Sequence, residues 1–135
     1  MKIDKTLIIA SAIIKNKKSE ILLLKRGGTK TFQSHWQLPE GKLEENENPR
    51  EALRREVKEE LGLDVESVEL NGVGQSILKA KGVTYLSLRL IFLVKAKTKK
   101  IILSPEHSDY KWVKPNKITR FELLPGTLEA IKSID

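Results

Sequence analysis

Cysteine is absent from the 135-residue sequence. Its absence excludes thiol catalysis and cysteine-ligated zinc or iron–sulfur sites, and it gives no reason to expect an oxidising compartment. A run of 18 apolar residues is also absent, which excludes a membrane-spanning helix. The first six residues are too polar to begin a signal peptide. We therefore expect a cytoplasmic protein with no membrane partner.

Internal repeats, low-complexity tracts and linkers rich in proline, glycine or serine are absent as well. Charged residues make up 32% and hydrophobic residues 39%, which is the balance of a globular protein. A chain of this length buries roughly two-thirds of its unfolded surface, enough for a core without metals or disulfides. We expect a single domain over residues 1–135, and the sequence makes no prediction of its oligomeric state.

Positive charge exceeds negative charge by +7, but its distribution is uneven. Residues 40 to 60 contain eight acids and five bases, whereas the rest of the chain contains ten acids and twenty bases. A basic body around an acidic cluster could attract a polyanion and present it to cations held by the carboxylates. The same charges could equally serve solubility alone.

Apolar patterns predict strands on both sides of a central helix. The segment 83–96 alternates, but both of its faces are largely apolar, so we expect a central strand covered on both sides. A closing helix is expected from Thr127, as N-cap, to about Ser133. This order favours an α+β or mixed-sheet layered domain. Further strands are expected at 7–14 and 21–24, around a polar turn at 16–19, at 36–38, and more weakly at 101–103 and 110–113.

The central helix has clear end signals. Asn48 can cap it, Pro49 suits its first position, and Glu51 stands three residues after Asn48 as a capping-box partner. Gly62 suits the left-handed position that ends a helix. These signals predict a helix between the proline and the glycine.

Carboxylates and apolar residues share neighbouring faces of this helix. At about 100° per residue, Glu56, Glu59 and Glu60 fall within one sector of about 100°. The apolar stripe lies directly beside it and consists of Leu53, Val57 and Leu61. Like charges beside a buried edge are costly unless cations neutralise them. Oxygen ligands without histidine or cysteine suit Mg²⁺ or Mn²⁺, which usually bridges to substrate phosphates, although a solvated acidic helix would show the same three acids.

A longer pattern surrounds these acids. Gly41 is followed after five residues by Glu47, and after seven more by Arg55-Glu56-Val57-Lys58-Glu59-Glu60-Leu61-Gly62-Leu63. Residues 41–63 thus resemble the Nudix box, Gx5Ex7REUxEExGU, at every specified position. Softer resemblance to the MutT-type branch of that family extends to Trp36-Gln37-Leu38-Pro39 and to Glu106 with Trp112. The resemblance implies an α+β fold with a mixed β-sheet sandwiched between α-helices.

The family resemblance also implies a hydrolase of nucleoside diphosphates linked to another group, with divalent cations such as Mg²⁺ or Mn²⁺ as cofactors. Glu59 and Glu60 are the first-choice metal ligands. Glu40 stands where many members carry the first glycine of a Gly-Gly pair, and its backbone carbonyl would support them.

The remaining catalytic roles stay open. Glu56 is either a further metal ligand or the base that takes the proton of the attacking water. Glu106 is a second candidate for ligand or base. Arg55 would fix the carboxylates by hydrogen bonds or hold substrate charge. Glu47 is expected to organise the loop before the helix.

Features of several other family branches are missing, which favours a (d)NTP substrate. ADP-ribose-type members tend to carry a proline about fifteen residues beyond the box, but the chain has no proline between Pro49 and Pro105. What remains resembles a small MutT-type pyrophosphohydrolase, which would convert a (d)NTP to a nucleoside monophosphate and pyrophosphate. Lys25 and Arg26, at the end of the second expected strand, could reach phosphate or base, or they could be ordinary strand-end cations.

Base selection is expected to depend on Thr127. By ungapped alignment from Trp112, Thr127 occupies the place of an asparagine that pairs with oxidised guanine in some MutT-type enzymes. One hydroxyl cannot replace the donor and acceptor of an amide. We therefore expect ordinary (d)NTPs to be hydrolysed, with only modest preference for 8-oxo-dGTP over dGTP.

Two alternatives remain. The basic body would favour a Nudix enzyme that acts on RNA 5′ ends. The sequence has no RNA-binding motif and no basic stripe interleaved with aromatics, so a nucleic-acid partner is not expected. The other alternative is a non-catalytic nucleotide-binding Nudix module, but a mere binding module has no need of Glu56, Glu59 and Glu60 together.

Overall fold

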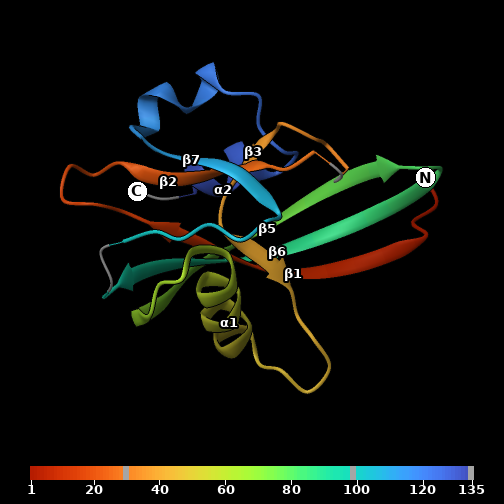
Figure 1. The fold of residues 1–135 in the computed structure, drawn as a ribbon. Helices are drawn as coiled ribbons and strands as arrows, with labels where there is room; N and C mark the ends of the chain where they lie inside the picture. The colour runs from red at the N-terminus through yellow and green to blue at the C-terminus, as the bar shows by residue number, and fades with distance from the viewer. Residues whose placement is uncertain (29–30, 98–99, 134–135) are drawn as a thin grey trace.

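The computed structural model describes residues 1–28, 31–97 and 100–133. Within these ranges the strands form a four-stranded and a three-stranded sheet (Figure 1). The parallel pairing of β1 with β6 makes the larger sheet mixed, as expected. Its order is β4 (Glu40–Lys42), β1 (Lys5–Ile14), β6 (Val83–Ala96) and β5 (Val65–Ala80). The smaller sheet has the order β3 (Trp36–Gln37), β2 (Ile21–Arg26) and β7 (His107–Val113).

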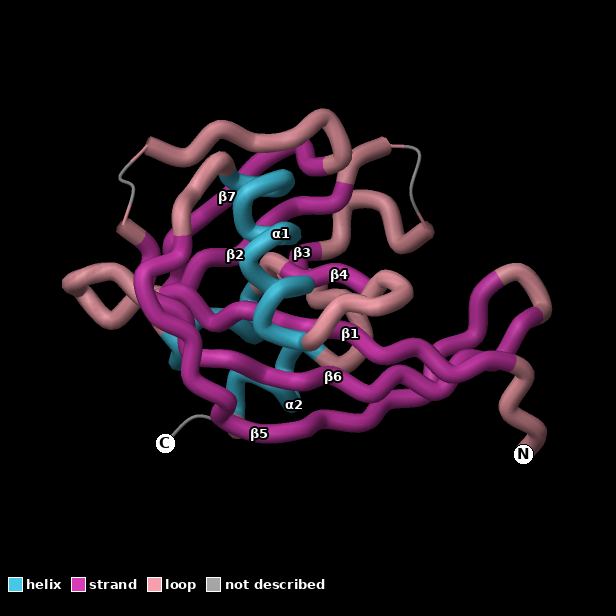
Figure 2. Tube along the Cα trace, turned by 90° about the horizontal axis from the view of Figure 1, so that it is seen from below, coloured by secondary structure: helices cyan, strands magenta, loops and turns pink. Residues whose placement is uncertain are grey.

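The strands form a layer between helices (Figure 2). Helix α1 (Pro49–Leu61) lies on one side, and α2 (Thr127–Lys132) with the 3₁₀ helix η1 (Pro115–Arg120) lies on the other. Strands β1, β2 and β6 contribute alternate residues to two buried apolar clusters, one against α1 and one against α2 and η1. The α+β fold with a mixed sheet between helices is therefore confirmed, although the strands divide between two sheets. In the part of the chain that the structure describes, no helix is long and apolar enough to cross a membrane.

Helix α1 begins and ends where its cap signals predict. The Asn48 side chain accepts a hydrogen bond from the backbone N–H of Glu51, and Pro49 occupies the first turn. Gly62 has φ of 70° and ends the helix in the left-handed conformation. Leu53, Val57 and Leu61 are fully buried against the strand layer. The predicted face of the helix is confirmed.

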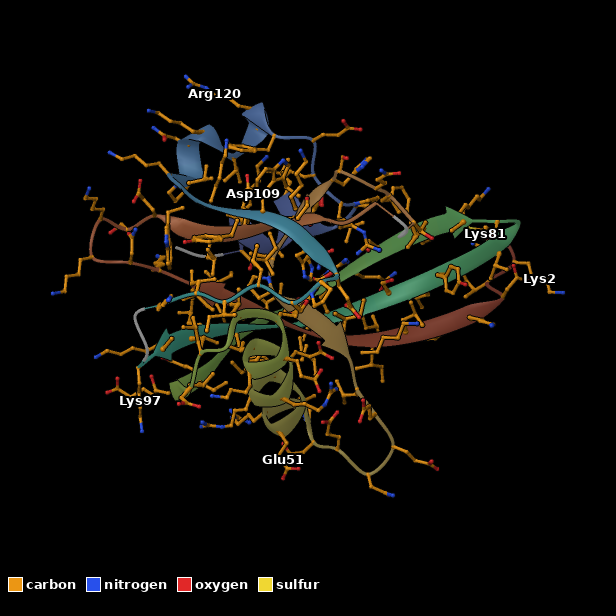
Figure 3. All side chains as sticks on the ribbon, in the orientation of Figure 1. Lys2, Glu51, Lys81, Lys97, Asp109 and Arg120 are labelled. Carbon is orange, nitrogen blue, oxygen red and sulfur yellow. The ribbon has the colours of Figure 1, made fainter. Side chains whose placement is uncertain are left out.

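Strand β5 was not predicted from the sequence. It pairs with β6 in a long hairpin whose tip carries Lys81, labelled in Figure 3. Lys81 and Gly82 both have positive φ, as a tight hairpin turn requires. Because β5 is an edge strand with one exposed side, its sequence is polar and glycine-rich and gives only a weak strand signal.

Two sequence expectations are wrong. Residues 101–103 form no strand, because this segment hydrogen-bonds to the end of α1: the Ile102 N–H donates to the Leu61 carbonyl at 2.9 Å. Gly126, not Thr127, is the N-cap of α2. Gly126 has φ of 92°, and Thr127 already belongs to the helix.

Candidate active site

A cavity of about 410 Å³ lies between the α2-facing side of β1, β5 and β6, the loop after β2, and the edge formed by β4 and α1. Its walls are of two kinds. The charged wall consists of Arg26, Lys42, Glu56, Glu60 and Glu106. The apolar and aromatic wall includes Leu7, Ile9, Phe32, Leu78, Tyr85 and Leu124. Glu40 and Arg89 also line the cavity, together with Thr31, Gln37, Gly41, Ala80 and Ser87.

Glu56 reaches this cavity by passing close to the backbone of β4. A Cβ atom added at Gly41 would overlap the Glu56 carboxyl group. The glycine that begins the 41–63 pattern therefore has a steric reason, because any side chain there would displace Glu56. The short strand β4 and helix α1 therefore pack closely where Gly41 meets the Glu56 carboxyl group.

Electrostatics at Glu56 favour a partner of positive charge. Burial raises the pKa of the Glu56 carboxyl group above its ordinary value, and the charges of Glu59 and Glu106 raise it further. The hydrogen bond from Arg55 opposes this shift but does not cancel it. A carboxylate held beside other carboxylates in a partly buried place is stabilised in its ionised form when a cation is bound nearby.

Arg55 binds several carboxylates at once. Its guanidinium group donates to Glu47 at 2.6 and 3.0 Å, to Glu56 at 2.7 Å and to Glu59 at 3.2 Å. The hydrogen bonds from Arg55 hold the pKa of Glu47 below its ordinary value. The Glu44 N–H also donates to Glu47, so Glu47 joins the loop before α1 to the helix. Arg55 thereby contacts the carboxylates directly, one of the two roles that the sequence left open.

Glu60 is the most buried acid of α1, with 4% of its surface exposed. Its carboxylate lies 3.6 Å from the imidazole Nε2 of His107, which is buried at the start of β7. No chemistry is expected at His107 from the sequence alone. The contact joins positions 47 residues apart, and a lone histidine next to Glu106 carries no spacing signal that would indicate it.

The donor chemistry of the charged wall fits a hard divalent cation. Glu56, Glu60 and Glu106 offer only oxygen, and Mg²⁺ commonly binds one or two carboxylates together with substrate phosphates. Over residues 1–28, 31–97 and 100–133, no three acidic or histidine side chains already surround a common point. The arrangement therefore fits an open site that substrate oxygens complete, and not a closed protein cage.

The structure places the other predicted metal ligands differently. Glu59 shares the α1 sector with Glu56, but its side chain is 59% exposed, pairs with Arg55 and is not part of the cavity wall. The Glu40 side chain is committed to other partners: it accepts two hydrogen bonds from Arg89 and one from Ser11. Only its backbone carbonyl remains a candidate ligand, as the sequence analysis expected.

Of the three predicted substrate-binding residues, one lines the cavity and two lie outside it. Arg26 lines the cavity, and its guanidinium donates to the Thr31 carbonyl at 2.7 Å and to Gln37 at 2.5 Å. Lys25 is outside the cavity because its ammonium lies over the Trp36 ring, 5.9 Å from the centroid. Thr127 is also outside it, with a buried hydroxyl that has no hydrogen-bond partner among the described residues. Arg89, Gln37 and Lys42 are cavity residues that the sequence analysis did not select.

Comparison with known proteins gives the family. A model of the NUDIX domain matches residues 5–134. The nucleoside triphosphatase NudI of Escherichia coli O139:H28 is 28% identical over 133 residues, which cover 92% of this chain and 93% of that protein. The solved MutT protein of Methanosarcina mazei Go1 has a TM-score of 0.80 and 30% identity, over 97% of this chain and 94% of that one.

Other relatives match only in part. The 8-oxo-dGTP diphosphatase of Proteus vulgaris is 41% identical over 61 residues, 45% of this chain and 54% of that protein. The RNA pyrophosphohydrolase of Marinomonas sp. (strain MWYL1) is 43% identical over 60 residues, 44% of this chain and 35% of that protein. The chain thus matches about half, or less, of the length of these two relatives. Because the family model covers nearly the whole sequence and the solved fold agrees, the chain belongs to the Nudix hydrolase family.

Proposed function

We propose that the protein is a pyrophosphohydrolase that converts a (d)NTP to the nucleoside monophosphate and pyrophosphate. The observation that carries this proposal is the cavity with two kinds of wall. Its charged wall suits phosphates and their cations, and its apolar wall suits a flat nucleobase. The full-length similarity to a nucleoside triphosphatase supports the same reading.

Mg²⁺ or Mn²⁺ is the proposed cofactor. Glu60 and Glu56 would hold it, with Glu59 after release from Arg55 and with the Glu40 backbone carbonyl. When bound, such an ion neutralises phosphate oxygens and lowers the pKa of a bound water. The MutT-like relatives and the oxygen-only donor set both support this assignment.

The chain's own residues would contribute position and charge. Arg26 is half-buried in the cavity, where its positive charge meets Glu40, Glu60 and Glu106. Its remaining N–H donors suit a phosphate oxygen. Glu56, with its raised pKa, and Glu106 are the two groups that can accept the proton of the attacking water.

A nucleotide panel tests this function. The protein is incubated with each (d)NTP and either Mg²⁺ or Mn²⁺, and the products are separated by ion-exchange chromatography. The expected products are a nucleoside monophosphate and pyrophosphate, and Glu60→Gln serves as the low-activity control. Release of orthophosphate and a nucleoside diphosphate, or no turnover of any nucleotide, would contradict the proposal.

RNA 5′ ends are the second candidate substrate. The basic excess outside residues 40–60 and the partial similarity to an RNA pyrophosphohydrolase favour it. The same assay with a 5′-triphosphate oligonucleotide separates the two. Free nucleotides are expected to have the higher kcat/KM, because the cavity of about 410 Å³ has the size of a single small ligand. A higher kcat/KM for the oligonucleotide would make it the substrate.

A further inference from the structure

Glu40 and Arg89 form an ion pair in the interior of the cavity wall. Their side chains are 7% and 5% exposed, and the Arg89 guanidinium donates through Nε and Nη2 to the two Glu40 oxygens at 3.1 and 3.2 Å. Ser11 donates to Glu40 at 2.7 Å, and Arg89 Nη1 donates to Ser76 at 3.1 Å. Glu40, Ser11 and Arg89 come from the three adjacent strands β4, β1 and β6, so the pair spans the sheet.

Stability alone does not account for this pair. Removing two charges from water costs several kcal/mol, and apolar residues of similar size often serve a core equally well. Two cavity residues of β1, Leu7 and Ile9, are apolar, and Ile9 is the direct neighbour of Arg89 in the sheet. Gly126 also leaves room for the guanidinium, because a Cβ atom there would overlap Arg89 Nη1. The surrounding fold is thus fitted to an arginine at this place.

The pair presents hydrogen-bond donors without net charge. Arginine has five N–H donors, and three of them bind Glu40 and Ser76. The two that remain are one on each terminal nitrogen, and no described residue accepts from them. Because Glu40 cancels the charge of Arg89, this part of the wall suits a neutral polar group better than a phosphate. The phosphates would be held at the charged wall, by Arg26 and the carboxylate-bound cation.

We propose that Arg89, held in place by Glu40, determines nucleobase specificity by donating to two adjacent acceptors on the base edge. This inference rests on the proposed nucleotide function and names its substrate class. Guanine offers such a pair at O6 and N7, and cytosine offers one at O2 and N3. Adenine and thymine offer no such pair, because on each base a hydrogen-bond donor lies between two acceptors or takes the place of one of them. Guanine and cytosine nucleotides are therefore the substrates.

Binding of the product nucleotides tests this specificity without turnover. Calorimetry with dGMP, dCMP, dAMP and dTMP in one Mg²⁺ buffer should give, for dGMP or dCMP, a Kd about 10- to 100-fold below those of dAMP and dTMP. The comparison of dGMP with dCMP identifies the base. If dGMP binds better, 7-deaza-dGMP, which lacks the N7 acceptor, should lose most of the advantage.

Arg89→Lys keeps the charge that balances Glu40 but loses the bidentate hydrogen-bond donor. Its four Kd values should agree within about 3-fold, whereas Arg120→Lys, at an exposed arginine far from α1 (Figure 3), should keep the wild-type ratios. The double variant Glu40→Met/Arg89→Met, which removes both charges together, should also lose the preference and provides the test if Arg89→Lys does not fold.

Equal Kd values for the four monophosphates in the wild-type protein, binding of none of them, or an unchanged preference in Arg89→Lys would each overturn the inference. A clear base preference without hydrolysis of any triphosphate would leave the specificity in place and overturn only the proposed pyrophosphohydrolase activity. Hydrolysis of all four triphosphates, with equal Kd values for their products, would overturn the specificity and leave the proposed pyrophosphohydrolase activity in place.

Discussion

Arg55 and Arg89 both bind carboxylates, but their surroundings differ. Arg55 contacts Glu47, Glu56 and Glu59 at an edge that solvent reaches, and the carboxylates outnumber it. Arg89 pairs in the interior with one carboxylate among the described residues, that of Glu40, and the two charges cancel. An excess of negative charge favours the binding of a cation and its phosphate, whereas a neutral ion pair distinguishes ligands only by hydrogen bonding. The difference separates the chemistry of the cavity from its selectivity.

The largest expected effect comes from the charged side of this comparison. Glu60→Gln should lower turnover by at least ~100-fold, because a neutral amide cannot hold the cation that stabilises the transition state. The near-isosteric change should leave the melting temperature close to that of the parent. Steady-state kinetics compare it with Glu129→Gln, at an exposed acid of α2. Near-normal turnover in Glu60→Gln would remove this residue from the metal site.

The position of the charged cluster depends on the buried face of α1. Leu53 is fully buried in the cluster between α1 and the strands, so Leu53→Ala should cost ~2–5 kcal/mol of unfolding free energy. Chemical denaturation followed by circular dichroism measures this loss. A parent-like stability would mean that the facing of the whole helix, carboxylates included, is wrong.

The neutral Glu40–Arg89 pair leads to a prediction for the hydrolysis of an oxidised guanine nucleotide. Oxidation at C8 places a hydrogen on N7 and removes one of the two acceptors that Arg89 would meet, and the Thr127 hydroxyl lies outside the cavity. Arg89 therefore gives 8-oxo-dGTP no advantage. The kcat/KM for 8-oxo-dGTP divided by that for dGTP should be about 10 or less under one metal condition. A ratio above ~1,000 would exceed what the remaining contacts can supply.

A smaller, pH-dependent effect is expected at Glu47. Hydrogen bonds from Arg55 hold the pKa of Glu47 below its ordinary value of 4.5, so the ionised form stabilises the fold. This contribution is present above pH 4.5 and is lost as the pH falls through the lowered pKa. Glu47→Gln should therefore melt below the parent at neutral pH, and the difference should shrink below pH 4.5. A difference that stays constant with pH would show that Glu47 acts by shape and not by charge.

Local signals explain why much of the fold and part of the site could be predicted. The ends of α1 depend on Asn48, Pro49 and Gly62, each of which acts within its own turn, and the buried stripe follows from helix periodicity. Strand β5 was missed because an exposed edge strand keeps polar residues. Residues 101–103 read as a strand because they are apolar, but their backbone binds α1.

The unpredicted parts of the site depend on contacts between distant residues. Glu40 and Arg89 are 49 positions apart, and their pairing follows from the order β4-β1-β6, which no spacing rule reveals. Lys25 and Arg26 are adjacent in β2, and because successive side chains of a strand point to opposite faces, Lys25 lies over Trp36 whereas Arg26 lines the cavity. The box pattern thus predicted the carboxylates but not the side chains opposite them.

One kinetic matrix tests the division of the cavity most directly. kcat/KM is measured for dGTP, dCTP, dATP and dTTP with the wild-type protein, Glu60→Gln and Arg89→Lys. Glu60→Gln should lower all four values by a similar factor and keep the base preference, whereas Arg89→Lys should remove the advantage of the preferred base and leave dATP and dTTP within about 3-fold of the wild type. A changed base preference in Glu60→Gln, or an equal loss on all four nucleotides in Arg89→Lys, would contradict the account.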